Sequence, residues 1–198
     1  MGKSRIEAFS DAVIAIIMTI MVLELRPPEG SEWADLGPLV PTFLVYALSF
    51  LYLGIYWNNH HHLFQATSRI TGGVLWANLN LLFWLSLFPF ATGWMGENHV
   101  APIPTAGYGV VLLMAAISFY ILQTVIVRAQ PPDSKISHAL GRDLKGKLSP
   151  VVYASGIVLA FVAPWASIAL YVLGAAIWLV PDRRIERQFD APTGISQE

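Results

Sequence analysis

Residues 5–23 read RIEAFSDAVIAIIMTIMVL, a charged opening followed by an apolar run of only 12 residues. A helix that crosses a bilayer normally needs about 20 apolar residues. Charged residues flank the run on both sides: Arg5, Glu7 and Asp11 before it, Glu24 and Arg26 after it. Charges this close to hydrocarbon usually face protein or a water-filled path. We therefore expect residues 5–25 to form a central helix that the rest of the chain shields from lipid.

The rest of the chain is too apolar for a soluble domain. Of its 198 residues, 55% are hydrophobic and 13% are charged, whereas soluble domains average about 25% charged residues. Four uncharged stretches are each long enough to cross a bilayer, namely 36–59, 70–96, 100–127 and 148–181. The last stretch would make a helix of about 50 Å, too long for one span. We expect Pro164 to break it, because proline removes a backbone donor and clashes with the preceding turn.

This pattern predicts an all-α integral membrane protein with six transmembrane helices per subunit. The expected helices are 5–25, 38–62, 69–95, 104–128, 147–163 and 165–181, within one transmembrane domain of residues 1–187. Residues 188–198 are expected to form a disordered tail. If both termini lie on one side of the membrane, 11 of the 12 Lys and Arg residues fall on that side, and only Arg26 falls on the other. Basic loops remain cytoplasmic, so we expect cytoplasmic termini.

Several classes of function are disfavoured by what the chain lacks. It has no cysteine, which excludes disulfides, thiolate metal sites and cysteine catalysis. It has no G-x-S-x-G, H-E-x-x-H or P-loop motif. Its basic residues follow the membrane topology rather than a nucleic-acid surface. We therefore expect no enzyme activity, no cofactor and no nucleic-acid partner.

The first helix has one uninterrupted apolar face. At about 100° per residue, the residues that share it are Phe9, Ala12, Ile16, Thr19, Ile20 and Leu23, which we call the stripe. Glu7 and Asp11 lie roughly opposite. A stripe of this kind is usually ordinary packing. If copies of the helix surrounded an axis, however, Ile16 and Leu23 would form stacked apolar rings, and such rings narrow a pore and gate it by dewetting.

Three adjacent histidines, His60-His61-His62, end the second helix. Helical neighbours are about 100° apart and cannot converge on one metal ion, so we expect no metal site. Hydrogen bonding is the better role, because indole and imidazole groups donate and accept. One interpretation is a buried network of Arg5, Asp11, Trp57, His60 and Asn78. The other is that the three histidines are exposed to water at the inner membrane surface and make no such network.

The stretch Thr105-Ala106-Gly107-Tyr108-Gly109 differs by one residue from the T-V-G-Y-G filter of ordinary potassium channels. That filter needs a short pore helix before it, in a loop that re-enters the membrane. Here Pro102-Ile103-Pro104 precedes it and an apolar run follows at once. We interpret the stretch as the start of the fourth helix, with glycines that allow close packing, and we expect no re-entrant filter loop.

Three motifs together resemble the signature of the transmembrane protein 175 family, the endosomal/lysosomal potassium channels and their bacterial and archaeal relatives. They are Arg5-x-x-x-Phe9-Ser10-Asp11, Trp57-x-x-His60, and Asn78 followed eleven residues later by Pro89. The resemblance covers the first three helices. The last three agree only in number and hydropathy.

The resemblance implies a fold and a function. A bacterial chain with one six-helix repeat would form a homotetramer in the inner membrane, with lipid and monovalent cations as its other partners. The first helices would line a leak-like, potassium-permeable pore with a constriction at Ile16, a further apolar layer at Leu23, and Thr19 or Ile20 between them. A structural network behind the pore helix would contain Arg5, Phe9, Ser10, Asp11, Trp57, His60 and Asn78.

Two other functions stay open on the sequence. The first is a proton channel or a proton-coupled transporter with Asp11 or His60 as relay, although transporters typically show internal repeats and broken helices. The second is a structural membrane protein that conducts nothing. Ion flux through purified protein separates these hypotheses.

Overall fold

The computed structural model describes residues 2–131 and 144–179, apart from the side chains of residues 144–147. The described part is an all-α bundle. Its elements are α1 (Lys3–Ile20), η1 (Met21–Glu24), η2 (Trp33–Leu39), α2 (Val40–Gln65), α3 (Gly72–Ser86), α4 (Phe88–Glu97), α5 (Pro102–Ala129), α7 (Leu144–Ala160) and α8 (Pro164–Leu179). Four segments are long and apolar enough to cross a membrane, and α7 and α8 are shorter apolar helices. The predicted all-α membrane protein with six helical segments is confirmed.

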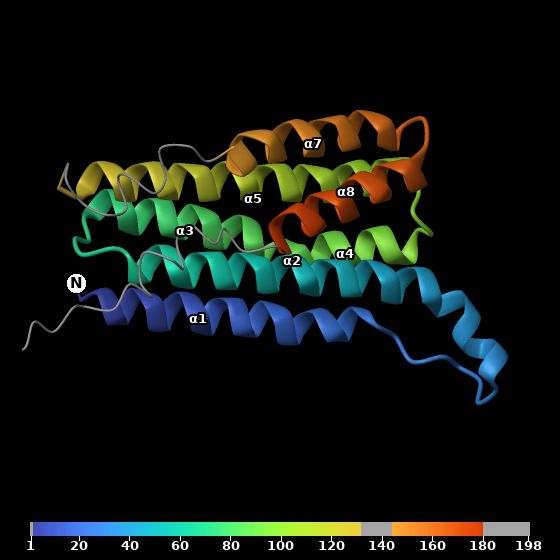
Figure 1. Ribbon diagram of the computed structural model, residues 1–198. Helices are drawn as coiled ribbons and strands as arrows, with labels where there is room; N and C mark the ends of the chain where they lie inside the picture. The colour runs from blue at the N-terminus through green and yellow to red at the C-terminus, as the bar shows by residue number, and fades with distance from the viewer. Residues whose placement is uncertain (1, 132–143, 180–198) are drawn as a thin grey trace, which may run out of the picture.

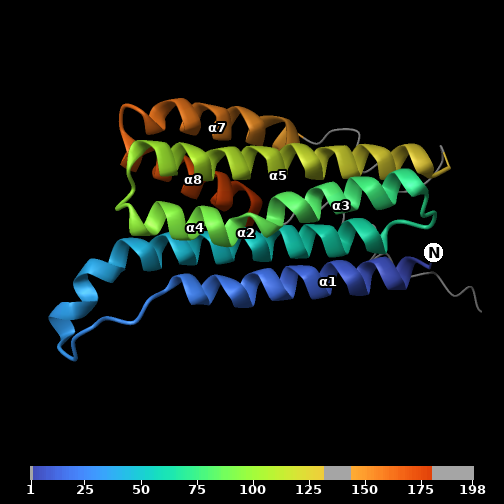
Figure 2. The ribbon, with the colours of Figure 1, turned by 180° about the vertical axis from the view of Figure 1, so that it is seen from behind.

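The helices lie alongside one another, with α1 at one edge of the bundle and α7 at the opposite edge (Figures 1 and 2). Helix α1 contacts α2, α3 and α4 on one side only. Just 28% of its apolar window is buried, against 39–50% in the other three long spans. The expectation that the rest of the chain shields this helix is therefore wrong for a single subunit, because three neighbours on one side leave its other side uncovered.

The first helix is shorter than expected. It is α-helical only to Ile20, and the tighter 3₁₀ turn η1 replaces its last expected turn. Leu25 then adopts an extended backbone. The helix has to end here because Pro27 and Pro28 follow, and proline disfavours helical backbone at itself and at the residue before it. Leu23 thus projects from a 3₁₀ turn, whereas Ile16 lies on regular α-helix.

The third expected helix, 69–95, is two helices. Helix α3 ends at Ser86 and α4 begins at Phe88, with Leu87 at the junction. Pro89 explains the break, because its ring has no N–H to donate to the turn before it and clashes with a carbonyl four residues earlier. Proline is tolerated at the second position of the new helix, where an N–H would lack an intrahelical partner anyway. The break lets α4 take its own direction beside α1.

The turn from α4 to α5 is a Schellman motif. The Val100 N–H donates to the Met95 carbonyl at 3.1 Å, and the His99 N–H donates to the Gly96 carbonyl at 3.2 Å. His99 and Val100 both have positive φ, 48° and 61°, which is costly for a β-branched side chain. Val100 is nevertheless 3% exposed, so burial of its side chain offsets part of the strain.

The filter-like stretch 105–109 lies within the first two turns of α5, as the sequence predicted. Its glycines allow other helices to approach closely. Gly107 faces the ring of Trp94 on α4, and Gly109 faces the hydroxyl of Tyr171 on α8. Tyr171 also donates to the Thr105 carbonyl at 3.3 Å. The stretch is therefore a packing site for α4 and α8.

Replacing Gly109 by Ala is expected to destabilise the bundle. A Cβ atom there would overlap the Tyr171 hydroxyl and meet Ile157 at 2.8 Å, and overpacking of this kind costs about 1–3 kcal/mol. Gly54 of α2 is the matched control, since a Cβ there meets nothing within 4 Å. Gly54→Ala should raise stability by about 0.5–1 kcal/mol through helix propensity. Thermal unfolding of both variants in one detergent measures the difference, and equal shifts would contradict this packing.

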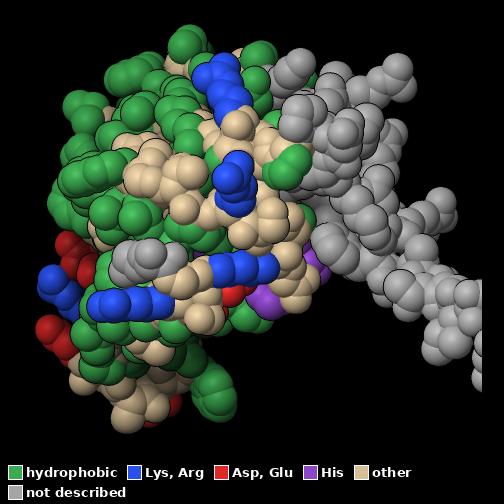
Figure 3. Space-filling view, turned by 90° about the vertical axis from the view of Figure 1, so that its left-hand side faces the viewer, with side chains coloured by type: hydrophobic (Ala, Val, Ile, Leu, Met, Phe, Trp, Pro, Cys, Tyr) green, Lys and Arg blue, Asp and Glu red, His purple; other side chains and the backbone are tan. Residues whose placement is uncertain are grey.

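Charge separates the two ends of the bundle. The end that carries the N-terminus, which we call the basic end, holds Lys3, Arg5, Arg69 and Arg128, and blue side chains gather on it in Figure 3. The opposite, acidic end holds Glu24, Glu29, Glu32, Asp35 and Glu97, together with Arg26. The remaining Lys and Arg residues of the topology argument lie in residues 132–143 and 180–198, outside the described part, or in residues 144–147, whose side chains are not described. The expected tail, 188–198, also lies outside it.

Candidate functional site

Helix α1 divides into a buried face and an exposed face. Its buried residues, Ile6, Ser10, Ile14 and Ile17, point toward α2 and α3. Every member of the stripe is exposed in the single subunit. Leu23 is 74% exposed and Ile16 is 56% exposed. A helix that faces lipid normally has a longer apolar run, without charges so close to both ends. The exposed face of α1 is therefore the candidate functional surface.

Thr19 brings an oxygen to this face. Its hydroxyl donates to the carbonyls of Ala15 and Ile16, at 3.0 and 2.9 Å. Because the hydroxyl proton is directed at the helix backbone, the lone pairs of the oxygen remain available to the exposed side. Ile20 is 44% exposed on the same side. Both residues considered for the position between Ile16 and Leu23 are therefore on the exposed surface.

Asp11 is turned toward α2. Its Oδ1 accepts a hydrogen bond from Trp57 Nε1 at 3.1 Å. Trp57 is itself 46% exposed, so this pair lies at the margin of the subunit and not in its core. The carboxylate next to the apolar run is thus held to one side of the stripe, as its helical position predicts.

Behind α1 lies a fully buried polar chain. His60 Nε2 donates to Asn78 Oδ1 at 2.8 Å, and Asn78 Nδ2 donates to Ser10 Oγ at 2.9 Å. All three residues are at most 2% exposed. The His60 ring also stacks on Phe64, with centroids 4.5 Å apart. This chain joins α1, α2 and α3, and of the two interpretations of the histidines it supports a hydrogen-bonded His60.

The structure does not bring Arg5 or Phe9 into this set. Both are exposed, and within residues 2–131 and 144–179 neither side chain has a hydrogen bond, ion pair or ring contact. Lys3, which is not part of the expected network, donates from its Nζ to the Gln65 carbonyl at the end of α2, at 2.9 Å. His61 bonds Gln65 at 2.9 Å. Among the described residues, no group of three metal-ligating side chains occurs.

Sequence reasoning missed Gln130, which fastens the α2–α3 loop to the end of α5. Its Oε1 accepts from the backbone N–H groups of Ser68 and Arg69 and from the Ser68 hydroxyl, at 3.0, 3.1 and 2.6 Å. Its Nε2 donates to the Arg69 carbonyl at 3.1 Å. The one available signal was a glutamine at the end of an apolar run, which by itself predicts nothing.

A second missed feature lies at the acidic end, where η1 meets α4. Arg26 Nη2 and Glu97 Oε1 form an ion pair at 2.8 Å. The Glu24 carboxylate lies over Gly93, in the space that a Cβ atom would fill. These contacts hold the 3₁₀ turn that carries Leu23 against α4. Both pairs are too far apart in sequence for helical spacing to predict them.

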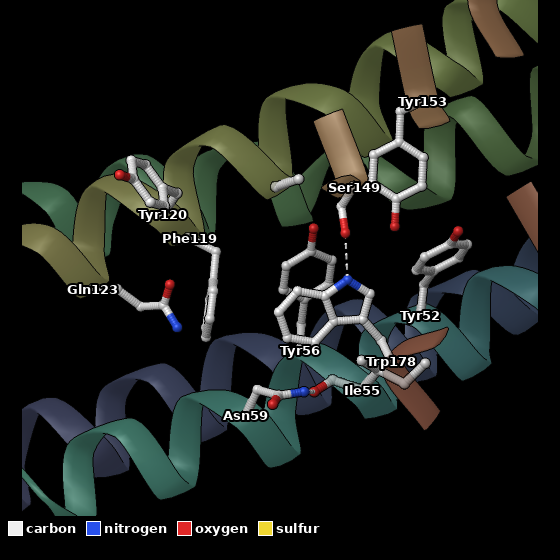
Figure 4. Close-up of a pocket in the computed structure, with 11 residues that line it drawn as sticks. Tyr52, Ile55, Tyr56, Asn59, Phe119, Tyr120, Gln123, Ser149, Tyr153 and Trp178 are labelled. Atoms are coloured by element: carbon white, nitrogen blue, oxygen red, sulfur yellow. Dashed lines mark hydrogen bonds between the residues drawn. The ribbon is translucent and has the colours of Figure 1, made fainter. Parts of the chain in front are cut away.

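A small cavity lies away from α1, between α2, α5, α7 and α8 (Figure 4). Aromatic side chains line most of it, and Trp178 Nε1 donates to Ser149 Oγ at 2.6 Å on its wall. Its volume of about 20 Å³ has room for about one water molecule. None of the residues that line the cavity lies on α1.

Comparison with known proteins supports the motifs. A family profile described as endosomal/lysosomal potassium channel TMEM175 matches residues 5–89, the helices that build the buried chain. A potassium channel of Chryseobacterium sp. (strain P1-3) is 54% identical over 187 residues, which cover 94% of this chain and 97% of that protein. The mouse endosomal/lysosomal proton channel TMEM175 is 34% identical over 103 residues, 46% of this chain and 21% of that protein.

A solved structure agrees over the whole fold. It is the crystal structure of a lysosomal potassium-selective channel TMEM175 homolog from Chamaesiphon minutus, with a TM-score of 0.81 and 26% identity. The match covers 92% of this chain and 97% of that one, so the likeness extends past the residues that the profile matches. With the motifs, the near-complete relative and the fold in agreement, this chain belongs to the TMEM175 family of ion channels.

Proposed function

We propose that the chain forms a homotetrameric, potassium-permeable, leak-like cation channel in a bacterial inner membrane. Four copies of α1 surround the pore with the stripe inward. Ile16 makes the narrowest ring, Leu23 makes a second apolar layer, and Thr19 presents oxygens between them. The name of the 54% identical relative, a potassium channel, supports the permeant ion.

One observation carries the proposal, namely the uncovered face of α1. The stripe on that face is apolar apart from Thr19, while Asp11 is bonded to α2 and Ser10 is buried beneath the helix. A helix this short is costly at a lipid boundary. Placing the uncovered face against an axis, with copies of the subunit around it, removes it from lipid.

The proposed mechanism is partial dehydration at Ile16. A ring of isoleucine side chains cannot replace the water ligands that an ion loses. The ion with the weaker hydration, K⁺ rather than Na⁺, then crosses more easily, and discrimination is modest. The Thr19 oxygens offer the only side-chain ligands between the two apolar layers. Permeation is passive and needs no cofactor.

The proposed orientation follows the charges. The basic end of the bundle faces the cytoplasm, and the acidic end faces outward. In this orientation Ile16 lies near the middle of the membrane and Leu23 lies nearer the outer surface. Protease protection of tags placed at either terminus in inside-out vesicles measures this arrangement, and a protected terminus would contradict it.

A potassium-gradient flux assay tests the proposed function. Purified protein in liposomes loaded with potassium chloride should release K⁺ with no pH gradient, and empty liposomes should not. Potassium flux that occurs only with an opposed proton gradient would contradict the channel and indicate a coupled transporter. If correctly folded, assembled protein shows no flux at all, the hypothesis of a structural membrane protein remains.

Proton permeation is a second candidate, and one specific observation favours it: the mouse relative is named a proton channel. The buried chain offers a poor relay, because both polar atoms of the Asn78 amide are engaged and His60 is only 1% exposed. Protons would therefore follow water in the pore. A pH-sensitive dye inside the same liposomes, with K⁺ replaced by an impermeant cation, measures this flux directly.

Replacing Asp11 by Ala is expected to reduce assembly. The change removes the acceptor of the Trp57 indole at the margin of the subunit, where we place a neighbouring copy, and the bond to a charged group is worth about 1.5–3 kcal/mol. Size-exclusion chromatography should show less tetramer and more small species. Asp11→Asn is the matched control, because its amide oxygen still accepts. Full assembly of the Asp11→Ala protein with altered ion selectivity would instead place Asp11 in the ion path.

A further inference from the structure

A cleft runs between α1 and α4. Its walls include Val13 and Ile20 of α1, and Pro89, Phe90 and Trp94 of α4, with Glu24 at its acidic end. Its volume is about 710 Å³, within the range of pockets that hold small organic ligands. Phe90 is 65% exposed and Trp94 is 38% exposed, so the aromatic wall is open to an occupant.

The acidic end of the cleft carries an excess negative charge. Glu24, Arg26 and Glu97 all line it, which gives a formal sum of −1. Arg26 is paired with Glu97 at 2.8 Å. Glu24 has no ion pair or hydrogen bond with any residue in the described ranges 2–131 and 144–179, and its carboxylate lies across the cleft against Gly93. An occupant with a positive group at this end would complement Glu24.

The aromatic wall fits the same kind of group. The rings of Phe90 and Trp94 are neighbours, with centroids 5.9 Å apart. An ammonium group near such faces is stabilised by cation–π attraction, more strongly where water is partly excluded. The rest of the cleft, toward Ile16 and Ser86, is almost wholly apolar. The cleft thus has an acidic, aromatic end that suits a cation, and an apolar groove that leads away from it.

We propose that this cleft binds a single-chain aliphatic ammonium amphiphile. The ammonium group lies beside Glu24 and Trp94, and the alkyl chain runs along Ile20 and Pro89 toward Ile16. From Ile16 to Glu24, α1 and η1 rise about 14 Å, four residues at the α-helical rise and four at the larger 3₁₀ rise, which is long enough to hold an extended decyl chain. Ile16 and Ile20 line this cleft and also belong to the stripe that we place around the pore, so binding of the occupant should also change potassium flux. That second effect rests on the proposed function, whereas binding does not.

Photo-crosslinking of the assembled protein in lipid vesicles tests the site. The probe is a decyltrimethylammonium analogue with a diazirine in its chain, and a neutral decanol analogue with the same diazirine is the control probe. Mass spectrometry should place the cationic adduct in peptides from α4 and the second half of α1. Glu24→Gln should reduce cationic labelling about fivefold, the scale of one partly exposed charge pair, and should leave neutral labelling unchanged.

Glu29→Gln is the matched control variant, because Glu29 lies at the same end but does not line the cleft; its labelling should equal that of the natural chain. Equal labelling by both probes, or labelling unaffected by Glu24→Gln, would overturn the proposal. Labelling that occurs only after the tetramer is dissociated would also overturn it, since a neighbouring subunit would then fill the cleft. Potassium flux is not needed for any of these outcomes, so a failed flux assay and a failed binding assay are separate results.

Discussion

Replacing Ile16 by Asn should bring the K⁺/Na⁺ permeability ratio of the protein close to one, the value of a wide, water-filled pore. Ile16 is 56% exposed on the face that we place around the axis. Asparagine is polar and carries its own hydrogen-bonding groups, so a ring of four would hold water where isoleucine repels it. Partly hydrated ions would pass, and the hydration difference between K⁺ and Na⁺ would no longer decide which one crosses. Bilayer recordings with the two salts on opposite sides measure the ratio.

Two control variants accompany this measurement. Ile16→Val keeps a branched apolar ring and should keep the preference for K⁺. Ile6→Val changes the same residue type on the buried face of α1 and should not affect the ratio. An Ile16→Asn protein that assembles normally and keeps its permeability ratio would remove Ile16 from the ion path and the constriction from the proposal.

Replacing Asn78 by Leu should have the largest effect on stability. The Asn78 amide is the middle link of the buried chain, so its loss leaves His60 Nε2 and Ser10 Oγ unpaired. Each buried group without a partner costs about 1–3 kcal/mol, and within a membrane no bulk water is at hand to replace the amide. We expect much less folded protein and a clearly lower unfolding temperature in detergent, measured by tryptophan fluorescence or by size exclusion after heating.

Asn80→Leu provides the comparison. Asn80 lies two residues away on the same helix and makes one hydrogen bond, from its Nδ2 to Ser118 Oγ at 2.7 Å, while remaining exposed itself. It should cost clearly less than Asn78→Leu. Equal losses from the two variants would mean that any polar group lost from α3 has the same effect, and that the chain through Asn78 has no special part in docking α1.

Much of this fold could be predicted from hydropathy and proline positions alone. Pro164 begins α8, and the glycines of 105–109 lie in a helix rather than a loop. Helical spacing also predicted that Ile16, Thr19 and Leu23 share one face, and all three are exposed, the first two on α1 and Leu23 on η1. These successes share a cause, because each depends on local chain properties that sequence spacing records.

One failure is local, and the others depend on partners far along the chain. Pro89 breaks the helix at Leu87. The sequence prediction missed this break because the apolar run continues past the proline, and summed hydropathy does not detect a single proline. Arg5, which the motif resemblance placed in the network behind the first helix, is exposed instead, and only the three-dimensional packing decides this. The Gln130 contacts depend in the same way on three-dimensional proximity. The motif resemblance found Asn78 and Ser10, which spacing within any single helix does not connect.

The order of synthesis gives the weak burial of α1 a further meaning. The segment leaves the ribosome before its partners, so Asp11 must wait for Trp57, 46 residues later, and Ser10 for Asn78, 68 residues later. Alone in the bilayer it would set a carboxylate against hydrocarbon at a cost of about 2.5–3.5 kcal/mol near the helix centre. We therefore expect the translocation machinery to retain this first segment until the third one has emerged, so that biogenesis, and not only conduction, depends on how few neighbours it has.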